Sequence, residues 1–476
     1  MNNQLRFLTR LTAACVCVAS GSLVFAQAPE KETPPPPSAP RDFAVPAPKE
    51  FVLDNGMSVT MLNYGNTPKV DVGLYVAAGN AYERANEVWL GDLTAQLMRE
   101  GTLTRTGTQI SKAVAEMGGD VDINVGADTA LVSGSALSEF TPDLIKLMAD
   151  LALHPKFPAT ELDRLKADNL RRLSIAKSNP QQMAVEKFRE VIYGDHSYGR
   201  IFPTEAMLKG YTLAQAKAFY DANWAASRTR IYVVGRFEAA PVEAAIRASF
   251  ASWKKGVMSH PVPPKPRAER AVHIVDKPGA VQTTLIVGLP TIDASNTDAI
   301  ALSVANNVLG GYFSSRMTEN LREDKGYTYS PYSQVQNRYR DATWAQNADV
   351  TTAVTGASLK EIFYEIDKIH AAPPSDAEIE SAKNYMLGNF VLRNSDRFGI
   401  ISQLEFIRLH GLPVDYLNTY IGKVRAVTPA RVQQMTQKYI DATKAVIIAV
   451  GDKKTIEDQV KPYGPVVPPL ALSPKR

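Results

Sequence analysis

Residues 229–235 (TRIYVVG) and residues 444–451 (KAVIIAVG) decide the fold, because a β-branched run that closes on glycine occurs in each half of the chain. Each run predicts a central strand. A helix-start signal precedes both, with Thr212 before the first run and Thr428-Pro429 before the second. Threonine is a favourable N-cap and proline suits the first helical turn. The two halves therefore end in the same helix–strand pair.

A second correspondence lies earlier in each half. Residues 141–148 lead through a proline break to a long predicted helix at 161–173, and residues 359–363 lead in the same way to one at 376–392. The repeated order of strands, helices and proline breaks predicts an α+β unit that is used twice.

The predicted boundaries follow from this repeat and from the proline content. They are a signal peptide at 1–26, a Pro-rich linker at 27–47, a first domain at 48–255, a linker at 256–270, a second domain at 271–461 and a tail at 462–476.

The N-terminus has the pattern of a secretory signal. Arg6 and Arg10 precede an apolar stretch at 11–25, and Ala26 or, less favourably, Ala28 offers a cleavage site. The apolar stretch is too short to span a membrane. We therefore expect export to the periplasm, with no transmembrane helix in the mature chain.

The positions of the cysteines and the net charge exclude several kinds of site and partner. Both cysteines, Cys15 and Cys17, lie inside the predicted signal, so the mature chain has no disulfide and no cysteine nucleophile. Lipid attachment at Cys15 is disfavoured because the preceding leucine lies one position too far away. The net charge of +4 is too small to favour a nucleic-acid partner.

The second half contains a long motif at residues 306–330, NNVLGGYFSSRMTENLREDKGYTYS. With the two α+β repeats, it resembles the C-terminal signature of the insulinase, pitrilysin and mitochondrial-processing-peptidase superfamily. The resemblance implies two homologous α/β-sandwich domains that form half of a clam-shell chamber. It also implies that Arg322 and Tyr329 reach across the closed chamber to a zinc site. Gly310 and Gly311 are then either a tight turn or a loop that contacts the peptide substrate.

Active members of that superfamily carry His-x-x-Glu-His on a helix, where two histidines bind zinc and the glutamate is the base. The matching stretch here is residues 89–102, WLGDLTAQLMREGT. In this register Asp92 and Gln96 replace the histidines and Ala95 replaces the glutamate. The helix of the third ligand offers Arg171-Arg172. The resemblance therefore implies no metal or other cofactor in this chain.

The Arg322–Tyr329 pair does not need a metal of its own. We expect a helix that ends at Lys325, a C-cap at Gly326 and a strand that carries Tyr329. An arginine fork can grip a peptide carbonyl or a developing oxyanion, and a tyrosine hydroxyl adds a second donor. The structural alternative is that Arg322 pairs with Glu319 or Glu323 and that Tyr329 is a core aromatic.

The leading hypothesis is a non-catalytic, substrate-binding and activity-completing subunit of a heterodimeric zinc metallopeptidase. A sister subunit would supply the zinc, and the peptide would bind in extended form along a sheet edge. One alternative is a non-catalytic scaffold protein of the same fold, similar to the core subunits of respiratory complexes. Another is a peptidase that is active alone through an unusual site.

Overall fold

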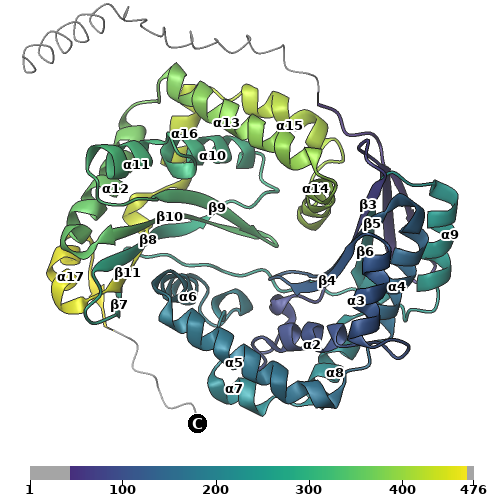
Figure 1. Cartoon of the computed structure of the whole chain (residues 1–476). Coiled ribbons are helices and arrows are strands. Elements are labelled where there is room, and N and C mark those ends of the chain that lie inside the picture. Colours follow the sequence, from purple (N-terminus) through teal and green to yellow (C-terminus); the bar gives the residue numbers. More distant parts are fainter. Residues whose placement is uncertain (1–42, 469–476) are drawn as a thin grey trace, which may run out of the picture. The chain divides into compact units, whose positions relative to one another are not determined.

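The computed structural model describes residues 43–468, so the predicted signal peptide and most of the first linker lie outside the described residues. Two six-stranded mixed sheets, each covered by helices, organise this part of the chain (Figure 1). The α+β fold class with two domains is therefore confirmed.

The first sheet has the strand order β1 (Lys49–Val52), β2 (Ser58–Asn63), β6 (Thr229–Gly235), β3 (Lys69–Val76), β5 (Ala130–Leu137) and β4 (Asp120–Val125). The second sheet has the order β12 (Val466–Val467), β7 (Val272–Asp276), β11 (Val446–Gly451), β8 (Gln282–Thr291), β10 (Asp341–Thr351) and β9 (Tyr332–Arg338). The two orders match strand for strand, except that an N-terminal strand begins the first sheet and a C-terminal strand begins the second.

The helices of the first half are α2 (Leu90–Arg99), α3 (Gly107–Glu116), α4 (Thr141–Leu153), α5 (Leu162–Ser178), α6 (Pro180–Tyr193), α7 (Glu205–Gly210), α8 (Leu213–Asn223) and α9 (Ala239–Phe250). Those of the second half are α10 (Ala299–Asn306), α11 (Arg316–Thr318), α12 (Thr355–Ala371), α13 (Asp376–Ser395), α14 (Arg397–His410), α15 (Tyr416–Arg425), α16 (Pro429–Tyr439) and α17 (Lys453–Val460). Within the described residues, no helix is both long and apolar enough to cross a membrane.

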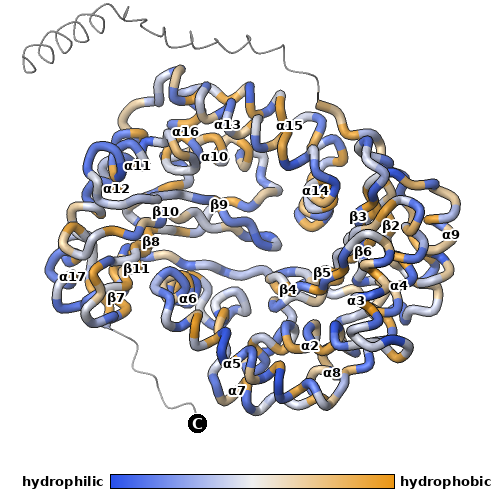
Figure 2. Tube along the Cα trace, viewed as in Figure 1, coloured by the Kyte–Doolittle hydropathy of each residue, from blue (hydrophilic) through white to orange (hydrophobic). Residues whose placement is uncertain are grey.

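The predicted helix starts and central strands are confirmed. Thr212 caps α8 in a capping box with Gln215, and the side chain of Thr428 caps α16, which begins at Pro429. The two glycine-terminated runs form β6 and β11, which lie inside their sheets. Hydrophobic residues accordingly follow the central strands, whereas the end of the β9–β10 hairpin is hydrophilic (Figure 2).

Each sheet is covered on one face by a helix from the other half. Helix α6 packs against β8 and β11, where Phe188 fills the space above Gly288. Helix α14 packs against β3 and β6, where Ile401 fills the space above Gly73. An added Cβ at either glycine would lie 2.8 Å from its covering side chain, so both positions require a residue without a side chain. Because both faces are covered, β3 and β8 are buried along almost their whole length, including the polar Asp71, Thr283 and Thr284.

A buried ion pair fixes the second of these contacts. Arg230 of β6 donates from Nε to Glu405 of α14 at 2.8 Å, and its second nitrogen pairs with the other carboxylate oxygen. The hydroxyl of Tyr232 donates to the same carboxylate at 2.9 Å. Exposed fractions of 15% for Arg230 and 6% for Glu405 mean that neither charge could be left unpaired without a large desolvation cost.

The linker and the tail are held more closely than their proline content predicts. In the linker, the carbonyl of Ser259 accepts from Tyr82 at 3.0 Å, and the ring of His260 stacks on Tyr339 at 5.4 Å. In the segment predicted as a tail, Val466 and Val467 form the short strand β12, which pairs with β7. Backbone pairing with β7 outweighs the local proline signal there.

We predict that Glu405→Ala destabilises the protein by about 3 kcal/mol, because Arg230 would then be a buried charge without a partner. Urea unfolding of the wild type and the variant measures this difference. Glu205→Ala is the control, since Glu205 forms an exposed pair with Lys209, and it should leave the unfolding curve unchanged. Equal effects of the two substitutions would contradict the role given to the buried pair.

Candidate functional site

The start of helix α2 is built around a buried carboxylate. Glu83 accepts hydrogen bonds from the backbone N–H groups of Trp89 at 3.1 Å and Gly91 at 2.8 Å, so it satisfies donors at the helix N-terminus. Trp89 has a φ of 67°, which directs the chain into the helix. Burial, reinforced by the negative charge of Asp92, raises the pKa of Glu83 to about 8.

The predicted degenerate positions lie on the face of α2 that meets α5. Asp92 forms an ion pair with Arg172 at 2.9 Å and also accepts from Asn80 at 2.9 Å. The guanidinium of Arg172 lies 3.8 Å from the centre of the Trp89 ring. Arg172, rather than Arg171, therefore faces Asp92, and it brings a positive charge to the place where a metal would need anionic ligands.

One helical turn further along, Gln96 and Asn169 form a reciprocal amide pair. Gln96 donates to Asn169 at 3.2 Å and Asn169 donates back at 2.7 Å. Ala95 is buried and offers no proton acceptor on its side chain. Sequence reasoning missed Asn169, although its place three residues before Arg172, one turn away on the same helix face, was a usable signal.

This donor set does not fit zinc. Zinc in proteins is held by several thiolate, imidazole or carboxylate ligands, whereas the site has one carboxylate that is already paired with a guanidinium, together with two amides that satisfy each other. Across residues 43–468, no three His, Cys, Asp or Glu side chains come together in a group that could hold a metal ion.

The second predicted site, in the 306–330 motif, brings its two key residues together. The guanidinium of Arg322 lies 4.5 Å from the ring centre of Tyr329 and 4.6 Å from that of Phe313, so it is sandwiched between two aromatic rings. Its Nε pairs with Glu323 at 3.1 Å. The structural alternative was correct about Glu323 but wrong about Tyr329, because that side chain is 77% exposed.

The backbone around the pair differs from the expected helix–strand turn. Residues Glu319–Asp324 form a π-helical segment, and Gly326 follows with a φ of 64°. The left-handed glycine expected after the helix is therefore present, whereas the helical segment ends at Asp324 and not at the expected Lys325. Tyr329 lies ahead of β9 and not within a strand; its neighbour Thr328 makes one isolated bridge to Val350. A π-helical turn inserts an extra residue, which changes the direction of Arg322 relative to a regular helix.

Gly310 and Gly311 form neither the tight turn nor the loop that the sequence suggested. They end a second π-helical segment, Asn307–Gly311, that packs on the sheet. A Cβ on Gly310 would lie 2.6 Å from the hydroxyl of Ser333, and one on Gly311 would lie 2.8 Å from the side-chain amide of Asn306. Close packing, against β9 and β10 for Gly310 and against the side chains of Asn306 and Asn307 for Gly311, is a sufficient reason for both glycines. A role in substrate binding stays a prediction.

Sequence reasoning also missed Phe313, which is 62% exposed and forms the second wall around Arg322. It lies within the quoted motif, and an aromatic residue next to a glycine pair was the available signal. Tyr312 contacts Tyr385 of α13 with ring centres 5.2 Å apart and ring planes tilted by 31°, which extends the aromatic surface toward this helix.

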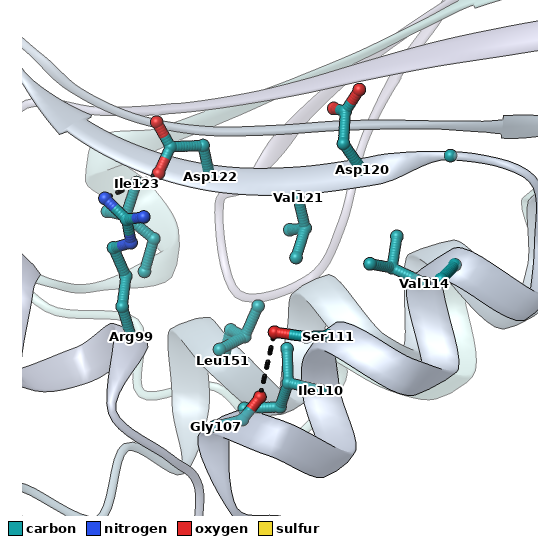
Figure 3. A pocket seen from close by; sticks show the side chains of 12 residues that line it. Arg99, Gly107, Ile110, Ser111, Val114, Asp120, Val121, Asp122, Ile123 and Leu151 are labelled. Carbon is teal, nitrogen blue, oxygen red and sulfur yellow. Dashed lines mark hydrogen bonds and ion pairs between the residues drawn. The ribbon is translucent and has the colours of Figure 1, made fainter.

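A cavity of about 310 Å³ lies beside β4, the edge strand of the first sheet (Figure 3). Val121 points from β4 toward Ile110 and Leu151, which gives the cavity an apolar wall. Arg99 and Asp122 form an ion pair of 2.8 Å across one end. The cavity combines apolar side chains with a strand edge that has no partner strand within the described residues.

The position of Arg172 predicts the outcome of rebuilding the zinc site. We expect the combination Asp92→His, Ala95→Glu, Gln96→His and Arg172→Glu to bind one zinc ion per chain, because it supplies three ligands on facing helices. The same combination with Arg171→Glu in place of Arg172→Glu should bind zinc about tenfold more weakly or worse, since the guanidinium of Arg172 would repel the ion. Calorimetric zinc titration compares them, and equal affinities would contradict the assigned register.

The buried carboxyl of Glu83 predicts a pH dependence of stability. Its folded pKa of about 8 exceeds the ordinary value of 4.5, so the folded state binds more protons than the unfolded state between about pH 5 and pH 8. Stability should therefore fall as the pH rises through this range. Glu83→Gln should reduce this slope in urea unfolding measured from pH 5 to pH 8.5, whatever its effect on stability at a single pH. An unchanged slope would contradict the assignment.

The comparisons with known proteins agree with this structure. Residues 59–203 match the family model for insulinase (peptidase family M16), and residues 210–386 match the model for the peptidase M16 inactive domain. Together these matches include α2, α5 and the 306–330 motif. The degenerate zinc positions lie in the first match and Arg322 and Tyr329 lie in the second.

Curated relatives include the uncharacterized zinc protease YmxG of Bacillus subtilis, which is 23% identical over 72% of this chain and 84% of its own length. An uncharacterized zinc protease of Mycobacterium leprae is also 23% identical, over 86% of this chain and 93% of its own length.

Among solved structures, a peptidase M16 inactive domain from Pseudomonas fluorescens has a TM-score of 0.78 and 25% identity, over 85% of this chain and 98% of its own. A protease from Helicobacter pylori has a TM-score of 0.79 and 16% identity, over 86% of this chain and all of its own, and this likeness concerns the fold alone. On the two domains, the two family matches and these likenesses, the chain belongs to the insulinase family of peptidases, family M16, with an M16 inactive-type domain over residues 210–386.

Proposed function

We propose that this protein is a non-catalytic, substrate-binding subunit that completes the active site of a zinc-binding M16 sister subunit. The complex would be a heterodimeric metallopeptidase that cleaves peptides in the periplasm. The observation that carries the proposal is an asymmetry between the halves: the zinc positions are filled by side chains that bind each other, whereas Arg322 and Tyr329 lie together with an exposed phenol.

The side chains at the former zinc positions of the first half support the proposal. The relatives that match this chain are named as zinc proteases, yet here Asp92 is paired with Arg172 and Gln96 with Asn169. Ala95 has no group that could accept a proton from a water molecule. A sister chain would therefore have to supply the metal, the water and the base.

The second half keeps hydrogen-bond donors that could serve another chain. The terminal nitrogens of Arg322 and the hydroxyl of Tyr329 make no hydrogen bond in the part of the chain that the structure describes, and Glu323 approaches Arg322 at Nε. The guanidinium contacts the aromatic rings of Phe313 and Tyr329, and these contacts do not use its N–H donors. A guanidinium and a phenol fit a peptide carbonyl that develops negative charge as it is attacked.

The edges of the sheets offer a way to hold an extended peptide. Strands β4 and β9 each have one edge without a partner strand within residues 43–468. A peptide that pairs with such an edge gains main-chain hydrogen bonds and places alternate side chains on one face. The apolar cavity behind Val121 would suit one of those side chains.

The proposal is tested in the complex with the zinc-binding sister chain, which we expect to copurify from the native cell. Arg322→Ala and Tyr329→Phe should each lower kcat/KM for peptide cleavage by about 100-fold, because each removes a donor to the transition state. Tyr364→Phe is the matched control: Tyr364 is an exposed tyrosine of α12, outside the motif and the sheet edges, and its variant should cleave normally.

Normal cleavage by both the Arg322 and the Tyr329 variants would refute the donated-donor role. A stable complex with a sister chain that lacks any peptidase activity would instead favour the scaffold function. Activity of the isolated wild-type chain with bound zinc would contradict both.

A further inference from the structure

A second cavity, of about 250 Å³, lies where the two halves meet, and three arginines line it. Arg189 comes from α6, Arg200 follows the short turn Ser197–Gly199, and Arg338 ends β9. The end of β4 forms another wall through Val125 and Gly126. Side chains from both halves therefore converge on one positively charged space.

None of the three arginines has a carboxylate partner within 4 Å in the described part of the chain. Arg189 donates to the side-chain oxygen of Gln336 at 3.1 Å, and Arg200 donates to the carbonyl of Asp195. Arg338 lies over the ring of Tyr198 at 5.9 Å from its centre. This differs from Arg230, which is equally a junction residue but has a full bidentate partner in Glu405.

Two carboxylates near the cavity accept hydrogen bonds from neutral groups, and the charge of Arg338 also acts on Asp341 without forming an ion pair within 4 Å. Asp128 accepts from the hydroxyl of Tyr198 and from the backbone N–H of Tyr339, and Asp341 accepts from the hydroxyl of Tyr193 at 2.6 Å. Glu83 lies in the wall of the cavity, but its two oxygens accept from the side-chain amide of Asn80 and from two backbone N–H groups at the start of α2. The positive charge of the cavity is therefore not neutralised by an ion pair within these residues.

The positive charges of Arg189 and Arg338 repel each other, and burial adds an energetic penalty for the charge of Arg189. Burial lowers the pKa of Arg189 to about 10, and the like charge of Arg338 adds to the effect. Arginine side chains with unused forks and no water to solvate them fully bind oxyanions strongly, because the planar guanidinium matches a carboxylate with two parallel hydrogen bonds. A bound anion would remove the mutual repulsion.

We propose that this cavity binds a carboxylate of the peptide substrate through Arg189 and Arg338. The position at the end of β4 supports this assignment: the C-terminus of a peptide that pairs parallel to the free edge of β4 would lie at the cavity beside Val125 and Gly126. The C-terminal carboxylate of a short peptide is the group that reaches such an end wall. An acidic side chain presents the same chemistry. The peptide nature of the ligand rests on the proposed function, whereas the carboxylate site rests on the arginines.

The test uses the full-length chain without its sister subunit and three uncharged or singly charged probes. N-acetyl-triglycine carries a terminal carboxylate, its C-terminal amide carries none, and N-acetyl-Gly-Asp-Gly-amide carries a side-chain carboxylate. Titration calorimetry at millimolar probe concentrations should show binding of N-acetyl-triglycine that is about tenfold tighter than that of the amide. Binding of the aspartyl probe instead would assign the same site to acidic side chains.

Arg338→Gln should abolish the preference for the carboxylate, and Arg338→Lys should keep only part of it, because lysine retains the charge and loses the fork. Arg340→Gln is the matched control: Arg340 is an exposed arginine two residues further along the same hairpin and outside the cavity, so its variant should bind like the wild type. Circular dichroism and urea unfolding confirm that each variant is folded.

The proposal is overturned if the wild type binds neither carboxylate probe better than the amide, or if Arg338→Gln and Arg340→Gln weaken binding equally. These outcomes are independent of the test of Arg322 and Tyr329, because no cleavage and no sister chain are involved. If the isolated chain binds the carboxylate but the heterodimer does not cleave peptides, the carboxylate site stands and the activity-completing role is refuted. If the heterodimer cleaves peptides but the isolated chain shows no preference for the carboxylate, the role stands and the site is refuted.

Discussion

The structure depends on the exchange of one covering helix between the two halves. A mixed sheet with an apolar central strand must bury both faces, and each half supplies only one layer of helices for its own sheet. Helix α14 crosses to β3 and β6, and α6 crosses to β8 and β11. The buried contact between Arg230 and Glu405 fixes the first of these crossings, since a displaced α14 would leave two buried charges apart.

This exchange also determines where chemistry can occur. Because α6 carries Arg189 to the end of β9, a cavity is formed from residues of both halves that neither half could form alone. The linker at 256–270 joins the same junction, where His260 stacks on Tyr339. The polar residues at the hairpin end of β9 and β10 are thus held by tertiary contacts and not by a loop of their own.

The two halves share one arrangement of strands but place different chemistry on it. In the first half, Arg172 places a cation beside Asp92 and stacks on Trp89, which makes the face between α2 and α5 a satisfied structural contact. In the second half, two π-helical segments direct Arg322 toward Phe313 and Tyr329 and leave the phenol exposed. Satisfied polar groups stabilise a fold, whereas exposed donors held by aromatic rings remain available to a ligand.

The sequence by itself determined the repeat, the α+β class, the starts of α8 and α16, and the loss of ligand chemistry at Asp92, Ala95 and Gln96, because these depend on local patterns and residue types. It did not determine which of Arg171 and Arg172 faces Asp92, the π-helical turns at Gly310 and before Gly326, the strand at Val466, or the pairing of Gln96 with Asn169. Only the tertiary structure decided these, because each depends on contacts between segments that are far apart in the chain or on packing that overrides local preference. The cavity of Arg189 and Arg338 belongs to the same class, since its two arginines are separated by nearly 150 residues and meet only when α6 crosses to the second sheet.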